Sequence, residues 1–416
     1  MSICVTKRCT GCYACYNICR HNAISMISDD KGFSYPIINH EICVGCGLCQ
    51  TVCPAINIVK RNKEPKGIYS GWSRDEETRL ASASGGAFSE LTKFFVDQLH
   101  GVVFGVAMNM NLEASHISIE DISELSKLQG SKYIQSNIDY SYRLVEQRLK
   151  EDRKVLFSGT PCQIAGLKNY LRKDYENLYT VDLVCHGVPS KRLFDDYVKH
   201  IERVLNRRVY DVKFRCKKNS WIYYNMALNS HFDKGSRQLH YDYEGFYYSD
   251  PFIRGFLRDN ALRLSCYQCQ YASISRVADF TLADWWGYKA VGKEDADFEK
   301  KGVSLILVNS EKAKVIMHKI NMLLKERTLN EAMETNMSLK QPFPIPNTYV
   351  TFWNDYNKMP FDQMIKKWMS PDLLSPSSYI IYKMKDSFFR RILFRLAKKY
   401  ENLSKKMNLR IVKINA

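Results

Sequence analysis

Two cysteine-rich runs of one spacing decide what the N-terminal part of this chain can form. Residues 9–19 read CTGCYACYNIC, and residues 43–54 read CVGCGLCQTVCP. Nine of the fourteen cysteines lie in the first 53 residues, and eight of these nine form the two runs. A tight loop with a cysteine at every third position can wrap three thiolates around one face of a cubane, so that a fourth thiolate must come from elsewhere.

This spacing, with proline after the second run, is the pattern of bacterial two-cluster ferredoxins. The resemblance implies a ferredoxin domain over residues 1–62 with two [4Fe–4S] clusters. It also implies that each run supplies its last cysteine to the other cluster. We therefore expect one cluster on Cys9, Cys12, Cys15 and Cys53, and the other on Cys43, Cys46, Cys49 and Cys19.

Two other metal chemistries compete for these cysteines. A pair of zinc sites also uses CxxC units, but zinc does not demand the duplicated three-plus-one spacing. Radical chemistry with S-adenosylmethionine needs a Cys-x3-Cys-x2-Cys run, which the sequence lacks. Cys4 belongs to neither run, and we interpret it as a small apolar residue.

Length, composition and charge bound the remaining possibilities. A chain of 416 residues has room for two or three domains. No N-terminal signal peptide and no run of 18 apolar residues is found, which favours a cytoplasmic protein. Cysteines in that compartment are typical of metal binding or redox chemistry. The net charge is +17, and about half of it lies in residues 379–416, which carry eleven Lys and Arg against Asp386 and Glu401.

The body of the chain alternates short apolar runs with helical stretches. After a polar linker with Pro65 and Gly67 as breakers, the sequence predicts the strands Gly101–Val106, Val155–Ser158 and Leu178–Val184 and the helices Phe88–Leu99, Tyr142–Glu151 and Leu193–Leu205. The alternation predicts an α/β (α+β) multi-domain protein: the ferredoxin module, an α/β flavin-binding body with a mixed or parallel sheet, and a basic helical C-terminal tail.

Several segments of this body resemble the family of the beta subunits of coenzyme F420-reducing hydrogenases and dehydrogenases, which includes plant chlorophyll-reductase relatives. These segments span about residues 69–310: Ser84–Gly86, Gln129–Ser136, Gly159–Gln163, Cys185–Ser190, Cys266-x2-Cys269 and Ala278–Gly287. The resemblance implies N-terminal-like and C-terminal-like regions of that family over residues 66–150 and 151–330, followed by a helical basic extension over 331–416. Members are flavoproteins that bind FAD and at least one further [4Fe–4S] cluster, so both are expected here.

The expected FAD site draws on three of these segments. Ser84-Gly85-Gly86 precedes a helix, whose first N–H groups favour a diphosphate, although a plain helix cap explains the motif as well. In the second segment, Gly130-Ser131-Lys132 would place a positive charge near the flavin ring, which favours the reduced flavin. The alternative interpretation of these residues is a solvated loop. The expected cofactor-binding residues are Ser84, Gly85, Gly86, Gly130, Ser131, Lys132, Tyr133, Gln135, Ser136 and Asp284. The sequence contains no GxGxxG motif, so it does not support a standard dinucleotide-binding Rossmann domain.

Five cysteines of the body remain to be explained. Cys266 and Cys269 can chelate a metal from one loop, while Cys162 and Cys185 each follow a predicted strand, where loops meet at one edge of a sheet. Together with the resemblance, this predicts a third [4Fe–4S] cluster on these four thiols, against the alternative of buried free cysteines. Cys216 is left as a spare thiol. His186 is a candidate proton donor to a substrate, or else a histidine bonded within a tight turn.

The C-terminal segment predicts an amphipathic basic helix. Its apolar positions include Met384, Phe388 and Ile392, with Arg390 and Arg395 largely on the opposite side. Such a helix can lie on an anionic membrane surface, which would place the protein at the periphery of the inner face, or it can pack on the body. Nucleic acid is the least favoured partner, because no binding module accompanies the charge.

These observations predict an oxidoreductase. Electrons would pass from a redox donor such as ferredoxin through the [4Fe–4S] clusters to a flavin and a small-molecule acceptor. One alternative is an electron-transfer subunit of a larger complex without its own substrate. The other is a zinc-bound nucleic-acid-binding protein, which would be colourless, whereas an iron–sulfur protein is brown. The substrate itself, and whether it is coenzyme F420, do not follow from the sequence.

Overall fold

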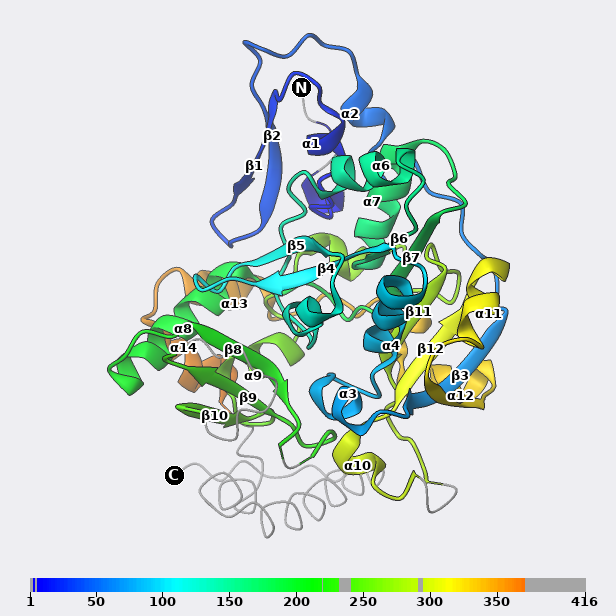
Figure 1. The fold of residues 1–416 in the computed structure, drawn as a ribbon. Coiled ribbons are helices and arrows are strands. Elements are labelled where there is room, and N and C mark those ends of the chain that lie inside the picture. Colours follow the sequence, from blue (N-terminus) through cyan, green and yellow to red (C-terminus); the bar gives the residue numbers. More distant parts are fainter. Residues whose placement is uncertain (1–2, 4–5, 219, 232–240, 291–294, 371–416) are drawn as a thin grey trace.

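The computed structural model describes residues 3, 6–218, 220–231, 241–290 and 295–370. Figure 1 shows a small N-terminal module at one end of a body that is built around a large twisted sheet. A second, smaller sheet lies in the lower part of the body in this view. The amphipathic basic helix predicted within 379–416 lies outside the described residues.

The N-terminal module consists of two short helices and one hairpin. Each helix directly follows a residue with positive φ, Tyr13 before the first and Gly47 before the second, so each cysteine loop turns sharply into its helix. The hairpin is antiparallel and pairs Ile24 with Ile38. The elements are α1 (Ala14–Ile18), β1 (Ile24–Ser28), β2 (Ser34–Ile38) and α2 (Leu48–Thr51).

The main sheet has eight strands in the order β13-β3-β12-β11-β7-β6-β4-β5. Its centre is parallel, because β4, β6, β7 and β11 pair in parallel, and antiparallel strands extend it on both sides. The strands are β3 (Gly67–Ser73), β4 (Val102–Met108), β5 (Ala114–Ile119), β6 (Val155–Ser158), β7 (Leu178–Leu183), β11 (Phe280–Asp284), β12 (Ser304–Val308) and β13 (Met322–Glu326).

Helices cover both faces of this sheet, and the alternation of side chains divides the core accordingly. On β4, Val102 and Phe104 pack toward α6 and α7, whereas Val103 packs toward α4 and α11. The N-terminal module packs on the α6 and α7 side, where Ile18 and Val52 join the same apolar cluster. The covering helices are α4 (Ala87–Lys93), α6 (Ser141–Lys150), α7 (Pro161–Leu171) and α11 (Glu311–Met317).

A third core lies around the smaller sheet, whose strand order is β10-β9-β8. The aromatic side chains of Phe194, Phe214 and Phe252 meet there at centroid distances of 5.2–5.9 Å. The elements are β8 (Asp211–Cys216), β9 (Asn225–Asn229), β10 (Tyr243–Phe246), α8 (Lys191–Leu205), α9 (Pro251–Leu257), α13 (Tyr349–Tyr356) and α14 (Phe361–Met364). The remaining short helices are α3 (Glu76–Ala81), α5 (Leu125–Leu128), α10 (Phe298–Lys301) and α12 (Leu329–Thr335).

The α/β fold predicted from the sequence is confirmed. The predicted strands over 101–106, 155–158 and 178–184 correspond to β4, β6 and β7. The helix predicted over 88–99 is α4, which continues as a π-helical turn over Phe94–Gln98. Strands from residues 66–150 and from 151–330 share the main sheet. Among the described residues, no helix combines the length and apolar character that crossing a membrane requires.

Candidate iron–sulfur and cofactor site

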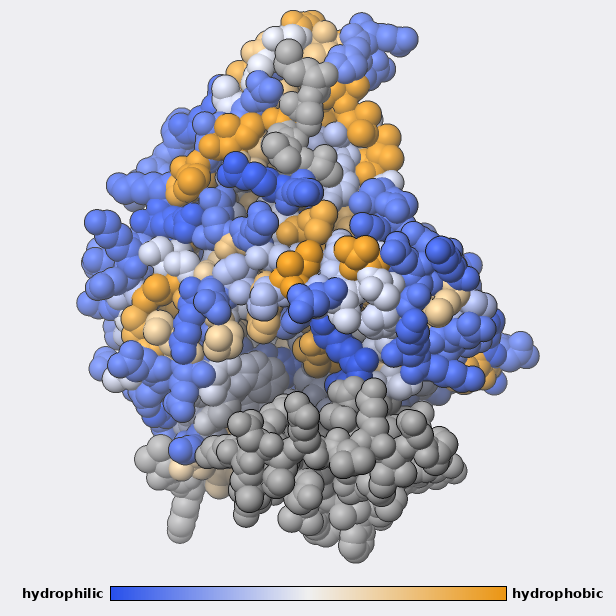
Figure 2. All heavy atoms as spheres, turned by 180° about the vertical axis from the view of Figure 1, so that it is seen from behind, coloured by the Kyte–Doolittle hydropathy of each residue, from blue (hydrophilic) through white to orange (hydrophobic). Residues whose placement is uncertain are grey.

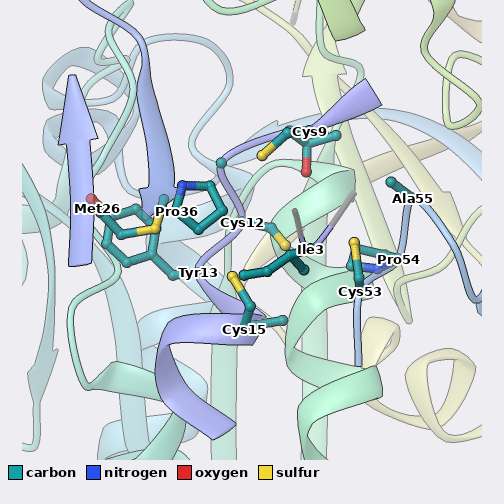
Figure 3. Close-up of a pocket in the computed structure, with 13 residues that line it drawn as sticks. Ile3, Cys9, Cys12, Tyr13, Cys15, Met26, Pro36, Cys53, Pro54 and Ala55 are labelled. Atoms are coloured by element: carbon teal, nitrogen blue, oxygen red, sulfur yellow. The ribbon is translucent and has the colours of Figure 1, made fainter. Parts of the chain in front are cut away.

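The first group of thiols lies where the N-terminal module meets the body. Cys9, Cys12, Cys15 and Cys53 line one small apolar pocket together with Ile3, and Figure 3 shows their sulfur atoms around a common space. All four are buried. Burial raises the pKa of Cys15, and the neighbouring charges of Cys12, Cys9 and Cys53 raise it further. The structure therefore brings together the four cysteines of the expected crossed set.

Helix α7 of the body supports this first group. The Tyr142 hydroxyl lies 2.8 Å from the carbonyl oxygens of both Cys12 and Gln163. Gly166 on α7 faces Cys12, and a Cβ at Gly166 would lie 3.1 Å from the Cys12 sulfur. A larger residue at Gly166 would therefore push Cys12 away from the helix. The absent side chain lets the cysteine loop seat directly on the body.

The second group lies toward the outer end of the module. Cys43 and Cys46 are exposed on a loop that leads into α2, whereas Cys19 and Cys49 are half-buried. Burial raises the pKa of Cys49, and the charges of Cys46 and Cys19 add to that rise. Cys19 therefore lies with the second run, as the crossed pattern implies. Figure 2 shows hydrophobic residues at this end of the molecule, and Ile42 and Val44 beside Cys43 are 48% and 62% exposed.

The third group is assembled from three separate stretches of the body. Burial raises the pKa of Cys185 well above its usual value, and the neighbouring charges of Cys266, Cys162 and Cys269 add to the rise. Burial raises the pKa of Cys266 to about 12, with contributions from Cys162 and Cys269. The geometry agrees, since Cys162 and Cys185 line one cavity and the N–H of Val188, three residues after Cys185, donates to the Cys266 sulfur at 3.4 Å. Thiolates so placed need the positive charge of metal ions to stay ionised.

The sheet explains how these four thiols meet. Cys185 stands two residues after the end of β7, and Cys162 stands in the first turn of α7 after β6, so both lie at the carboxyl edge of neighbouring parallel strands. A capping box of Thr160 and Gln163, with Pro161 between them, starts α7. Cys266 and Cys269 come from a 3-10 turn over Leu264–Gln268 and the residue after it.

The other two cysteines lie apart from these groups. Cys216 is buried at the end of β8. Its charge helps to raise the pKa of Tyr241, after the effect of burial. It has no place in the third group, in keeping with its interpretation as a spare thiol. Cys4 lies outside the described residues.

A cavity of about 430 Å³ opens beside the third group. Cys162, Cys185 and His186 form part of its wall, so the thiols and the cavity share a boundary. The volume is within the usual range of cofactor sites, about 300–1,000 Å³. Of the expected FAD-binding residues, nine line this cavity: Ser84, Gly86, Gly130, Ser131, Lys132, Tyr133, Gln135, Ser136 and Asp284.

Gly85 is the expected residue that does not line the cavity. Its N–H donates to the Ser304 hydroxyl at 3.0 Å, and a Cβ there would lie 2.4 Å from the carbonyl oxygen of Gly71. Gly85 thus lets the loop pass close to β3 and β12, and its N–H is not free for a phosphate. Gly86, with φ of 97°, caps α4 and faces the cavity instead.

Lys132 makes the cavity suitable for an anionic ligand. Its ammonium group donates to the carbonyl oxygens of Leu128 and Gln129 at 3.0 and 2.8 Å, at the end of α5. Among the described residues, no carboxylate pairs with it. Burial lowers the pKa of Lys132 to about 7. A cation on a cavity wall without a carboxylate partner fits the diphosphate of FAD.

Asp284 and His186 are held differently in the wall. The Asp284 carboxylate is fixed by an ion pair with Arg215 and by the Trp221 indole N–H at 3.0 Å, so it shapes the wall. The His186 Nε2 lies 2.6 Å from an Asp259 carboxylate oxygen, and the ring packs on Phe343 at 4.1 Å between centroids. The role of His186 as a proton donor stays a prediction.

Comparison with known proteins gives two family matches. Residues 8–57 match the 4Fe-4S dicluster domain, and residues 152–331 match the C terminus of the coenzyme F420 hydrogenase/dehydrogenase beta subunit. Over residues 152–331 the chain therefore carries the C-terminal region of this beta-subunit family. The N-terminal module is accordingly an iron–sulfur domain.

Two curated relatives come from methanogens. A coenzyme F420-dependent sulfite reductase of Methanocaldococcus jannaschii is 22% identical over 54% of this chain and 37% of its own length. An F420H2 dehydrogenase subunit of Methanosarcina mazei is 23% identical over 52% of this chain and 64% of its own length. The match therefore spans less than two thirds of either relative. A chain of the F420-reducing [NiFe] hydrogenase complex from Methanosarcina barkeri aligns with a TM-score of 0.45 and 13% identity, over 74% of this chain and 97% of that one.

A substitution of Cys46 tests the second cluster. We expect Cys46→Ser to lower the iron content by up to about four atoms per chain or to convert the cluster, because a hydroxyl is a harder and far less acidic ligand than a thiol. Cys46 is exposed, so the change leaves the core intact. Iron analysis and the magnetic resonance spectrum of the reduced protein measure the effect. Unchanged iron together with an unchanged spectrum would contradict the assignment.

Proposed function

We propose that the chain is an iron–sulfur flavoprotein oxidoreductase that passes electrons from a ferredoxin-like donor to a flavin and a small-molecule acceptor. The observation that supports this proposal is a series of cysteine groups that extends from the exposed end of the module to the wall of the cavity. Cys43 and Cys46 are exposed, the group with Cys12 is buried at the junction, and Cys162 lines the cavity.

The middle of this series is supported by contacts of one helix. Cys162 and Gly166 lie one turn apart on α7, with Cys162 in the third group and Gly166 against Cys12 of the first. Burial raises the pKa of Cys12, and the charge of Cys162 is among the smaller contributions to that rise. The first and third groups are therefore neighbours across a rigid element, which suits transfer between two bound clusters.

The cavity supports the flavin part of the proposal. Lys132 offers a positive charge and Gly86 a helix start to an anionic cofactor, while Tyr133 stacks on Phe256 at 5.3 Å between centroids and makes part of the wall flat and apolar. A bound flavin would supply the exchange between one-electron and two-electron chemistry. The residues of the wall would orient that cofactor and exclude water from its ring.

The runner-up is an electron-transfer subunit without its own substrate. One observation favours it: the Methanosarcina mazei relative is named as a subunit of a dehydrogenase. Turnover by the isolated chain separates the two functions, since a pure transfer subunit would accept electrons and oxidise no acceptor alone.

The deciding experiment is anaerobic purification with iron, sulfide and flavin quantified for each chain. We expect about twelve irons, as three cubanes require, and about one flavin. Reduced ferredoxin should then reduce the flavin, and oxidation by candidate acceptors, coenzyme F420 among them, is measured next. Protein that purifies with iron but binds no FAD when the cofactor is added would overturn the flavoprotein proposal.

A further inference from the structure

A single arginine spans the junction of the first group, the third group and the cavity. Arg263 directly precedes the turn that carries Cys266, and the Cys266 N–H donates to its carbonyl oxygen at 2.9 Å. The backbone N–H of Arg263 donates to Val188 of the cavity wall, also at 2.9 Å. Its backbone is thus part of the third group's support, while its side chain extends toward the N-terminal module.

The guanidinium donates to the first group, to the hairpin of the module and to the cavity wall. Its Nε donates to the carbonyl oxygen of Cys9 at 2.8 Å, and one Nη donates to the carbonyl oxygen of Ser34 at 2.8 Å and lies 3.7 Å from the Cys9 sulfur. The other Nη donates to the Gln135 side chain at 3.0 Å, and Gln135 lines the cavity. The Tyr35 ring stacks on the guanidinium at 4.3 Å.

The burial of this cation is the decisive point. Arg263 is 0% exposed, and among the described residues no carboxylate forms an ion pair with it. Arginine stays protonated in proteins, and an isolated buried charge is strongly unfavourable. The other large, fully buried arginine, Arg276, pairs with Asp182 at 2.9 Å. The acceptors around Arg263 among the described residues are uncharged oxygens and the Cys9 sulfur, so an anionic group bound at Cys9 would supply its counter-charge.

Thiolate-ligated clusters supply that negative charge. A cubane with four thiolate ligands is anionic, and each added electron makes it more so. The Cys9 sulfur is within reach of the guanidinium, and the carbonyl oxygen of Arg263 accepts the N–H of Cys266 in the third group. Hydrogen bonds and positive charge at cluster sulfurs stabilise the reduced state and raise the reduction potential.

We propose that Arg263 is a positioning residue that raises the reduction potential of the cluster on Cys9, Cys12, Cys15 and Cys53 above that of the exposed cluster. This inference rests on the proposed function. One electron then moves from the exposed cluster to the buried one, with no bond made or broken, and is held beside the body. The same guanidinium orders Gln135 at the cavity wall, so the electron's position and the cofactor site are physically linked.

The test is a redox titration of the full chain, followed by magnetic resonance, with Cys46→Ser used to assign the exposed cluster. Arg263→Met should reduce the equilibrium constant for transfer to the buried cluster at least tenfold, which is about 59 mV for one electron. Arg263→Lys should restore most of this loss, because it keeps the charge and loses only the planar fork.

Two further variants keep the outcome decisive. Arg263→Gln removes the charge but keeps a hydrogen-bond donor, so it carries the test if Arg263→Met does not fold. Arg79→Met is the matched control: Arg79 is also buried, but it donates to Gly302 and pairs with Asp297, away from the cysteine groups. The reduction potentials of this control should match those of the wild type.

A wild-type reduction potential of the buried cluster in Arg263→Gln, with full iron content, would overturn the proposal. Wild-type clusters that titrate normally without any flavin would count against the proposed function alone.

Discussion

Replacing Cys266 by alanine should lower the iron content from about twelve to about eight atoms per chain, because one of three cubanes loses a ligand. The charge of Cys266 adds to the raised pKa of Cys185, the charge of Cys162 adds to that of Cys266, and the Cys266 sulfur accepts the Val188 N–H at 3.4 Å. Alanine offers no ligand in its place. Reduction of the flavin by the donor should slow by more than the roughly 10–100-fold that the loss of outer-shell partners produces.

Iron analysis and rapid-mixing kinetics with reduced ferredoxin measure these two effects. The matched control is Cys216→Ala, which removes a buried thiol of the same body that lies outside the third group. This control variant should keep its full iron content and the wild-type rate of flavin reduction. If Cys266→Ala also keeps about twelve irons, the body cysteines are structural thiols, and electrons must reach the flavin directly from the N-terminal clusters.

These measurements need the full chain, because the module and the body share a core. Ile18 and Val52 of the module pack in one apolar cluster with Ile164 of α7, and Arg143 donates to the carbonyl oxygens of Asn17 and Cys19 at 2.8 Å. A truncation that begins near Lys66 would expose this surface. Loss of iron in such a fragment would then report misfolding as well as ligation.

The structure also explains which parts of the site a sequence can predict. A repeated spacing within a short loop is local information, so the thiol groups around Cys12 and Cys49 follow from it directly. The third group needed one further step: Cys162 and Cys185 come after parallel strands, and the ends of such strands meet at one edge. The resemblance to a known family contributed the expectation that Cys266 and Cys269 join them.

Other features of the site depend on tertiary contacts with no local pattern. Arg263 lies three residues before Cys266, yet its partners Cys9 and Gln135 are 254 and 128 positions away. Phe256, which stacks on Tyr133, likewise carries no motif. Gly85 was expected to line the cofactor site and does not. A glycine is needed both where the chain passes close to Gly71 and where a helix start binds phosphate, so the residue type alone does not separate the two.

Replacing Lys132 by methionine should weaken the binding of FAD at least about tenfold, since a hydrogen bond to a charged group contributes roughly 1.5–3 kcal/mol. Lys132 lines the cavity, and its ammonium donates to the carbonyl oxygens of Leu128 and Gln129. The matched control is Lys127→Met on the same short helix. Lys127 is 54% exposed and pairs with Glu124 in solvent, so its loss should leave FAD binding unchanged. Fluorescence titration of the flavin-free protein measures both.

The pH dependence separates a charge effect from a change in shape. Burial lowers the pKa of Lys132 to about 7 in the free protein, and a bound anion must raise it again. Below that pKa the ammonium already carries its proton, so affinity is constant. Above it, binding must take up a proton, and affinity should fall by up to about tenfold for each pH unit. Lys132→Met should lose this dependence and bind equally at pH values on either side of the transition. An equal slope in both proteins would show that Lys132 does not contact the anion.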